Sequence, residues 1–356
     1  MSDQHPPAST EIAVGSRAAW HNESFWQRWG RRAITIPGYL VGTVVIWLIA
    51  PVVIPIVAIV DLIRRDKWSA LRAYAFLLMY FGAEFAGILA LFAAWLFSGV
   101  WAGVNRRQFL DWNYTIQRWW AKWLWQVGRR IYRLNLIVDN FEVATPGPIL
   151  VFFRHAAMPD TILPAELFLV QQRMRLRYVM KRDLLWDACL DIGGNRLPNY
   201  FVRRDSQNTT RETDILHAMT ADVAPDEGVM IYPEGTRFSH RKRDGILRRL
   251  RERGNEAALK RAESLKHVLP PRLGGALAIL EGNPGMDAVF CTHVGFEIAN
   301  RLYNLINGAL VGRTIHINMW RVPFKDIPTE TAARIEWLFE QWRRVDRWIS
   351  EHIEKI

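Results

Sequence analysis

Residues 148–160 read PILVFFRHAAMPD, and this stretch decides the fold. Its first part, 148–153, is a short uncharged run of the kind that forms a strand buried on both faces. The run ends at Arg154, and His155 and Asp160 follow where a helical stretch begins. A buried strand that leads through a turn into a helix is the repeating unit of α/β proteins. We therefore expect a mostly parallel sheet covered by helices.

Six further runs support this fold, because they are short, β-rich and separated by helical or polar stretches. They are LNLIV (134–138), LRYVM (176–180), NYFV (199–202), GVMIY (228–232), DAVFCTHV (287–294) and TIHINMW (314–320). We assign residues 134–328 to this domain and residues 329–356 to a C-terminal helix.

The first third of the chain has a different character. After a polar tail, residues 1–30, the segment 31–105 contains two hydrophobic runs. Residues 33–60 carry no charge, and residues 73–104 carry only Glu84, so each run exceeds the roughly 20 residues that cross a bilayer as a helix. Three prolines in the first run leave open a kinked span or a re-entrant hairpin. We interpret Glu84 as a structural residue, and basic residues on all flanks leave the orientation open.

Residues 106–133 place aromatic residues at helical spacing opposite arginine and lysine. Five tryptophans within this segment favour a helix in the membrane interface. The alternative is an amphipathic helix that packs on the catalytic domain.

The composition limits the classes of function. A formal charge of +11 implies an anionic partner, but the basic residues flank apolar runs and no nucleic-acid-binding motif is present. Two cysteines provide neither a disulfide framework nor a zinc site, so we expect no metal and a reducing compartment. A nucleic-acid-binding membrane protein would rest on charge alone.

His155 and Asp160 form the candidate catalytic dyad. An imidazole held at one nitrogen by a carboxylate is a suitable general base for removing a hydroxyl proton. No GxSxG elbow is present, so an acyl-serine intermediate is not indicated. His217 and Asp222 have the same spacing, but they lie in a predicted helix, where their side chains would point about 140° apart. We interpret that second pair as structural.

Two further motifs follow. YFVRR carries Phe201 and Arg204 at the end of a short strand, and PEGTR carries Glu234, Gly235, Thr236 and Arg237 after another. Glycine permits a tight turn, and arginine offers a planar fork that matches phosphate oxygens. Two such arginines near one histidine would hold a phosphate beside a reactive hydroxyl.

In this order the motifs resemble the glycerolipid acyltransferase family, which makes phosphatidic acid from 1-acylglycerol 3-phosphate. LKHVLPPRLGG (265–275) is similar to the fourth block of its lysocardiolipin and lysophosphatidylglycerol acyltransferase branch. The resemblance covers residues 106–325 and implies a membrane phospholipid acyltransferase, expected on the cytoplasmic face of a bacterial inner membrane. It implies acyl-CoA or acyl-carrier protein as donor, membrane lipids and a lysophospholipid as partners, and no bound cofactor.

The resemblance also implies roles for single residues. His155 would be the general base and Asp160 its orienting partner. Arg204 and Arg237 would bind the acceptor phosphate. The remaining substrate-binding residues would be Phe201, Glu234, Gly235, Thr236 and Pro271, the last beside the acyl chain, with Lys181 as a further cation.

The chain departs from the family pattern at Arg154, where Asn is frequent, and at Pro198, where Gly is usual. A basic insert, 240–253, reads as a solvated face, a lipid anchor or a dock for the donor. These departures leave other acceptors open, namely lysophosphatidylglycerol, lysocardiolipin, glycerol 3-phosphate or an amino-lipid. A membrane-tethered lipid-binding protein without catalysis is the alternative from another class.

Overall fold

The computed structural model describes residues 23–65, 67–103, 106–202, 209–300 and 302–353. Within these ranges, one sheet of seven strands has the order β1-β7-β6-β2-β5-β3-β4. Every neighbouring pair is parallel except β6 and β7. The strands are β1 (Asn135–Asp139), β2 (Ile149–Phe153), β3 (Arg175–Lys181), β4 (Tyr200–Val202), β5 (Glu227–Ile231), β6 (Asp287–Val294) and β7 (Thr314–Val322). The predicted fold class is confirmed, and each predicted run overlaps a strand.

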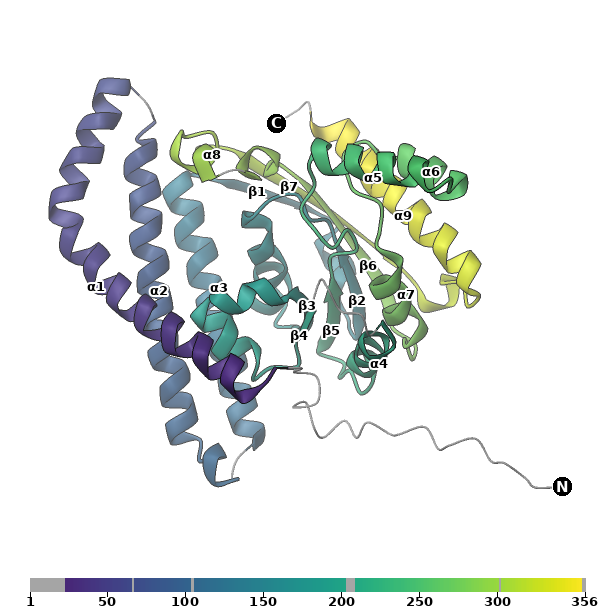
Figure 1. Ribbon diagram of the computed structural model, residues 1–356, viewed down its shortest axis with the longest axis horizontal. Coiled ribbons are helices and arrows are strands. Elements are labelled where there is room, and N and C mark those ends of the chain that lie inside the picture. Colours follow the sequence, from purple (N-terminus) through teal and green to yellow (C-terminus); the bar gives the residue numbers. More distant parts are fainter. Residues whose placement is uncertain (1–22, 66, 104–105, 203–208, 301, 354–356) are drawn as a thin grey trace.

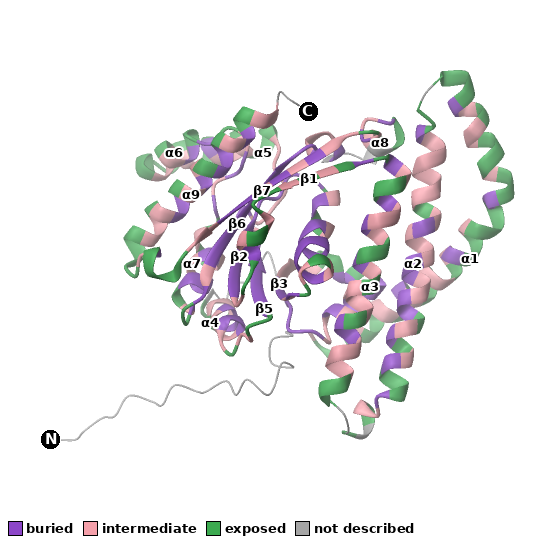
Figure 2. Ribbon diagram, turned by 180° about the vertical axis from the view of Figure 1, so that it is seen from behind, coloured by how far each residue is buried: buried purple, intermediate pink, exposed green. Residues whose placement is uncertain are grey.

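Helices cover both faces of the sheet (Figures 1 and 2). One layer consists of α4 (Thr209–Thr220), α7 (Leu273–Glu281) and α9 (Thr331–His352). Its apolar side chains share a core with Leu150 and Phe152 of β2. Val151 and Phe153 point to the other face, toward α3 (Arg106–Tyr132) and the π-helical segment Ala165–Gln171. Because successive strand residues face opposite sides, β2 is buried throughout, as its uncharged run predicts.

A pair of outer helices lies beyond this core. α5 (His240–Glu252) and α6 (Glu256–Glu263) contact each other, and α5 contains most of the basic insert. Among the described residues, none of the exposed large apolar side chains belongs to either helix. An interfacial lipid anchor normally inserts such side chains, so this pair offers only charge to a membrane.

The first hydrophobic run forms one helix, α1 (Phe25–Arg64), which contains three prolines and changes direction along its length (Figure 1). The run is therefore a bent helix and not a re-entrant hairpin. α1 also begins earlier than expected, so residues 25–30 do not belong to the polar tail. The cause is a capping box, in which Ser24 Oγ accepts from the backbone N–H of Gln27 and the Gln27 side chain accepts from that of Ser24. The Ser24-x-x-Gln27 spacing was a usable signal.

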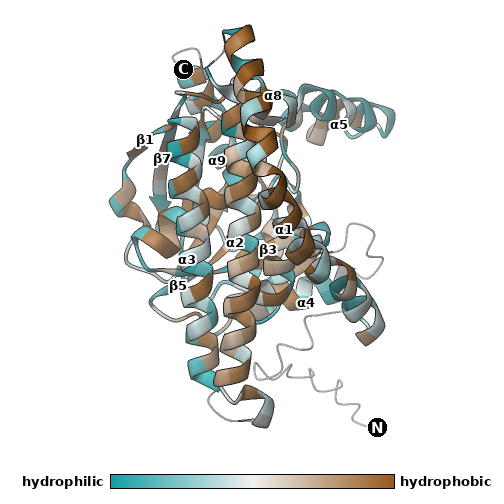
Figure 3. Ribbon diagram, turned by 90° about the vertical axis from the view of Figure 1, so that its left-hand side faces the viewer, coloured by the Kyte–Doolittle hydropathy of each residue, from teal (hydrophilic) through white to brown (hydrophobic). Residues whose placement is uncertain are grey.

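α1 and α2 (Ser69–Phe97) are both long and apolar enough to cross a membrane. Figure 3 shows that hydrophobic residues predominate along both helices, and Figure 1 shows that both helices lie on the side of the molecule opposite α9. A 40-residue helix is about 60 Å long, roughly twice the thickness of the hydrocarbon layer. Length alone therefore prevents all of α1 from lying in the hydrocarbon of a straight crossing.

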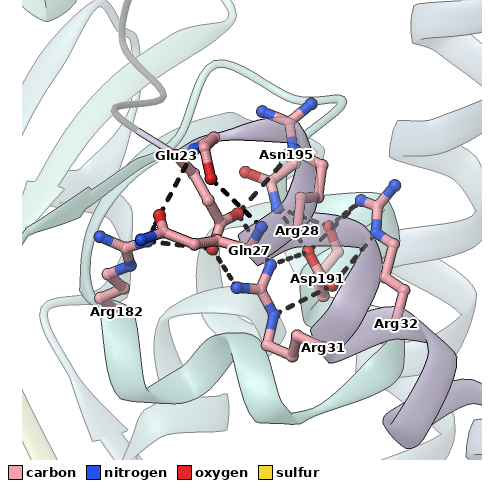
Figure 4. A network of polar contacts seen from close by, with 9 residues as sticks. Glu23, Gln27, Arg28, Arg31, Arg32, Arg182, Asp191 and Asn195 are labelled. Atoms are coloured by element: carbon pink, nitrogen blue, oxygen red, sulfur yellow. Dashed lines mark hydrogen bonds and ion pairs between the residues drawn. The ribbon is translucent and has the colours of Figure 1, made fainter.

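The N-terminal part of α1 is joined to the catalytic domain by ion pairs (Figure 4). Asp191, which is fully buried, accepts from Arg31 Nη2 at 2.9 Å and from Arg32 Nε at 3.1 Å. Glu23 accepts from Arg31 and, at 3.0 Å, from Arg182. Removing one partner of a buried pair leaves an uncompensated charge, which costs about 3–5 kcal/mol. α1 is therefore a fixed part of the domain surface over its first turns.

The Trp-rich segment forms α3, which lies alongside α2 and contacts the π-helical segment Ala165–Gln171 on its other side (Figure 1). Trp125 is buried in the domain core, whereas Trp119 and Trp123 stay exposed. The helix therefore packs on the rest of the domain, as the alternative interpretation expected. The exposed Trp119 and Trp123 remain available to a membrane interface, so the interfacial position of 106–133 stays a prediction.

Candidate active site

The predicted dyad is assembled in the turn after β2. Asp160 lies in the 3₁₀ turn Pro159–Ile162, and its Oδ1 is 2.9 Å from His155 Nδ1. Its Oδ2 accepts from the backbone N–H groups of Ala156 and Ala157, at 2.6 and 2.7 Å. The carboxylate thus closes the turn that carries the histidine. The four-residue spacing brings the two side chains together because the turn folds back on itself.

The electrostatics of the dyad favour an ionised aspartate. Burial by itself raises the pKa of Asp160, but the hydrogen bonds with His155 and His293 lower it by more. The resulting pKa of Asp160 lies well below its usual range. The ionised carboxylate accepts a hydrogen bond from the Nδ1–H of His155, which leaves the lone pair on Nε2. Nε2 has no hydrogen-bond partner among the described residues, and 8% of the side chain is exposed. His155 is therefore oriented at one nitrogen and open at the other.

Glu234 connects three loops at this edge of the sheet. Its Oε1 accepts from His155 N and its Oε2 from Leu269 N, each at 2.9 Å. Burial raises the pKa of Glu234 to about 8, although the two N–H bonds oppose this shift. Only 1% of the residue is exposed. Glu234 accordingly shapes the site by holding the histidine loop against the 265–275 block.

The PEGTR turn is held in place by further contacts. Gly235 has φ +62°, and a Cβ there would lie 2.6 Å from the Arg272 side chain. Arg272 N donates to Pro233 O at 2.8 Å, and Phe238 N donates to His155 O at 2.9 Å. The turn therefore needs glycine both for its backbone conformation and for the close approach.

The other predicted residues divide between packing and charge. Phe201 is buried, and its ring packs so closely on Gly194 that a Cβ added at that glycine would lie 2.9 Å from it. Pro271 is buried in the 265–275 block, and Thr236 Oγ1 accepts from Lys242 Nζ at 3.0 Å. Phe201 and Pro271 thus act through packing.

Two predicted cations lie at this edge of the sheet. Arg237 is half-buried, and within the described residues its guanidinium has no hydrogen bond or ion pair. Lys181 ends β3 and is paired in register with Val202 of β4. The predicted phosphate ligand Arg204 lies outside the described residues, two positions after Val202.

The decoy pair stays apart. α4 ends at Thr220, and Asp222 follows in a left-handed conformation with φ +49°. His217 Nε2 instead lies 3.8 Å from Glu281. The helix ends before the sequence pattern suggested, so the separation arises from the helix terminus as well as from helical geometry.

Sequence reasoning missed three residues around the dyad. The Arg154 guanidinium is fully buried, where it pairs with Glu297 Oε1 at 2.5 Å and donates to the His293 and His267 carbonyls. Arg154 therefore holds these loops together and cannot reach an acceptor. The expectation that Arg154 affects the choice of acceptor headgroup was wrong. His293 lies beside Asp160, and the Tyr232 ring lies 4.4 Å from the His155 ring. His293 had a signal, a polar residue at the end of a buried strand run.

Other kinds of catalytic centre find little support here. Cys189 and Cys291 are buried, and burial raises the pKa of both thiols, so neither resembles a reactive thiolate. The residues that the structure describes contain no group of three or more His, Cys, Asp or Glu side chains placed to hold a metal ion.

Two comparisons with known proteins find similarities to this chain. Residues 135–271 match the family model described as Acyltransferase. The matched stretch is similar to an acyltransferase domain, and it contains both the His155 turn and the PEGTR turn. A solved structure, the 1-acyl-sn-glycerophosphate (LPA) acyltransferase PlsC from Thermotoga maritima, is 14% identical with a TM-score of 0.47. That alignment covers 79% of this chain and 95% of the other.

Proposed function

We propose that this chain is a membrane acyltransferase that moves a fatty acyl group from a thioester donor to the free hydroxyl of a lysophospholipid. The observation that carries the proposal is the state of His155, with Nδ1 held by an ionised Asp160 and Nε2 open. The similarity of residues 135–271 to the Acyltransferase family supports the same reaction class. The donor is acyl-CoA or acyl-carrier protein, and no bound organic cofactor is needed.

The chemistry follows from the orientation of the dyad. Nε2 of His155 accepts the proton of the acceptor hydroxyl while its oxygen attacks the thioester carbonyl. Asp160 stabilises the imidazolium that forms, because its carboxylate stays ionised 2.9 Å away. The C–S bond then breaks, and the thiolate takes the proton back from His155. The acyl group passes directly to the acceptor, without an acyl-enzyme.

An anionic acceptor is favoured by the cations at this edge of the sheet. Arg237 is two residues beyond Gly235, and its guanidinium has no partner among the described residues. Lys181 ends a neighbouring strand, and Arg204 follows the next one. A phosphate bound there would place the glycerol hydroxyl near His155, so 1-acylglycerol 3-phosphate is the simplest acceptor.

The proposed acceptor also explains the attached helices. A lysophospholipid resides in a membrane, and α1 and α2 are suited to one by length and composition. α1 is fixed to the domain through Asp191, so membrane attachment also orients the domain. Because both donors are cytoplasmic, we place the domain on the cytoplasmic face of a bacterial inner membrane.

The same machinery accommodates related acceptors. Lysophosphatidylglycerol, lysocardiolipin and glycerol 3-phosphate present a hydroxyl near a phosphate, and an amino-lipid would use an amine as nucleophile. The buried Arg154 has no part in this choice. Headgroup selection would instead rest with Arg237, Lys181 and Arg204.

The proposal is tested by mass spectrometry of the products formed by the purified full chain. Each of these acceptors is offered with acyl-CoA and with acyl-carrier protein, and His155→Ala serves as the inactive control. We expect phosphatidic acid from 1-acylglycerol 3-phosphate. Absence of acylated product from every acceptor, or equal product from His155→Ala, contradicts the proposed function.

A further inference from the structure

His293 occupies an unusual position for a buried polar residue. It lies near the end of β6, next to β2, and its side chain is completely buried. Its Nε2 is 3.5 Å from Asp160 Oδ2 and 3.3 Å from the carbonyl oxygen of Arg154. Its Nδ1 is buried without a hydrogen-bond partner. Asp160 thus has a histidine on each side, one at each carboxylate oxygen.

The contacts of His293 identify its proton. Both neighbours of Nε2 are acceptors, so Nε2 carries a hydrogen that they share. A second proton on Nδ1 would place an unpaired donor and a charge in a buried site, beside the Arg154 guanidinium that donates to the His293 carbonyl. His293 is therefore a neutral imidazole with its hydrogen on Nε2.

We propose that His293 is a positioning residue for the reaction, which holds the Asp160 carboxylate in the rotamer that keeps Oδ1 on His155. This inference rests on the proposed function. The N–H groups of Ala156 and Ala157 hold Oδ2 from the side of the turn, and His293 holds it from the neighbouring strand. Ala156 and Ala157 belong to the same turn as Asp160, whereas His293 belongs to β6. The His293 N–H therefore links the dyad to the sheet.

Arg154 completes this connection. Its carbonyl oxygen accepts from His293 Nε2, and its guanidinium donates to the His293 carbonyl and pairs with Glu297. The rings of Phe153 and Phe296 lie 5.8 and 6.1 Å from that of His293. The imidazole is thus held by packing and hydrogen bonds, as a group that orients another must be.

The test compares His293→Gln and His293→Phe with the parent. The amide nitrogen of glutamine takes the position of Nε2 and keeps the donor, whereas phenylalanine keeps only the shape. We expect His293→Phe to lower kcat about tenfold to a hundredfold with KM nearly unchanged, as for a misplaced catalytic group. His293→Gln should recover most of this loss. His316→Gln is the matched control, because His316 pairs with Asp139 at 2.6 Å on β7, away from the dyad.

The pH profile separates positioning from a loss of folded protein. Among the described residues, the charged or titratable groups around the dyad include His293, Tyr232, Glu234, Arg154 and Glu297. A looser Asp160 stabilises a positive charge on His155 less well, so we expect the acidic limb of kcat/KM to move to lower pH. His293→Phe should show this shift, and His293→Gln should not. A smaller folded fraction lowers the rate without moving the limb.

Nuclear magnetic resonance of the parent and both variants gives a readout without turnover. The His155 proton shared with Asp160 should give a downfield resonance in the parent that is retained in His293→Gln and lost or moved in His293→Phe. An unchanged resonance and pH profile in a folded His293→Phe variant overturns the inference. Should His293→Phe fail to fold, loss of the resonance in His293→Gln overturns it. An intact resonance in a parent that acylates no acceptor instead overturns the proposed function and leaves this geometry standing.

Discussion

The loops at the sheet edge, residues 154–160 and 233–238, contain the same ingredients as the outer segments 209–222 and 240–254. Each of these two regions has a histidine five residues before an aspartate, at least one arginine that is not fully buried, and a glycine with positive φ. In the edge loops the side chains meet, because three neighbouring strands end there and every loop contacts the next. In the outer segments, His217 Nε2 lies 3.8 Å from Glu281, Asp222 follows the end of α4, and Arg251 pairs with Glu263 of the next helix. The chemistry therefore depends on what surrounds a motif, and the two regions supply matched controls for each other.

The largest difference in kcat should appear between the variants of His155 and His217. His155→Ala removes the general base, and we expect kcat to fall by about 10² to 10⁴, equivalent to about 3 to 5 kcal/mol of barrier. His217→Ala should leave kcat within about twofold, since the His217 side chain is 40% exposed and its Nε2 has Glu281 as an ion-pair partner at 3.8 Å. Steady-state acyl transfer checks both. Equal losses of kcat in the two variants would contradict the assignment of His155 as the general base.

The next difference is in the KM for the lysophospholipid, between variants of Arg237 and Arg249. Arg237→Ala should raise the KM for the lysophospholipid about tenfold to a hundredfold and leave the donor KM unchanged, because one charge-assisted hydrogen bond is worth about 1.5–3 kcal/mol. Arg237→Lys should recover part of this, since an ammonium lacks the planar fork. Arg249→Ala on α5 is the control, because within the described part of the chain Arg249 donates only to the backbone of its own helix. A change confined to the donor KM would assign Arg237 to donor binding instead.

A smaller difference is expected between two glycines with nearly equal φ. Gly254, at φ +63°, has open space around its hypothetical Cβ, so Gly254→Ala should cost about 1–2 kcal/mol of folding stability from the left-handed backbone. Gly235→Ala should cost at least about 1 kcal/mol more, because its Cβ would meet the Arg272 side chain. Thermal unfolding measures both. Equal losses would show that Arg272 moves aside freely.

The last difference is a pH dependence of stability at Glu234. Its folded-state pKa of about 8 lies above the ordinary 4.5, so the folded protein holds a proton that the unfolded chain has released between these values. Stability from this group is therefore fully present below about pH 4.5 and is lost as pH rises toward 8. The Tm of the parent should fall relative to Glu234→Gln over this range. Glu252→Gln, on exposed α5, should follow the parent, and a Glu234→Gln variant that does so too would contradict the shift.

Local patterns were sufficient for most of the fold. The run 148–153 predicts a strand because uncharged β-rich residues fit a position buried on both faces, and β2 is such a strand. Helix limits were less predictable, as α1 begins at Phe25 and α4 ends at Thr220. Such ends depend on a few capping contacts and on what lies beyond the helix, which hydrophobic periodicity does not record. The sequence could not assign the Trp-rich segment to core or interface for a similar reason, since an apolar helix face fits a membrane and a protein core equally well.

The sequence by itself determined which residues stand at the candidate site, because the His155 turn and the PEGTR turn follow strand runs that must end at one edge of a parallel sheet. Only the tertiary structure decided what those residues do to one another. The Glu234 carboxylate holds His155 and Leu269 together, Arg154 is buried, and His293 flanks Asp160. These contacts join strands and loops that are distant in the chain. Their partners are chosen by the packing of the whole sheet, and no local spacing contains that information.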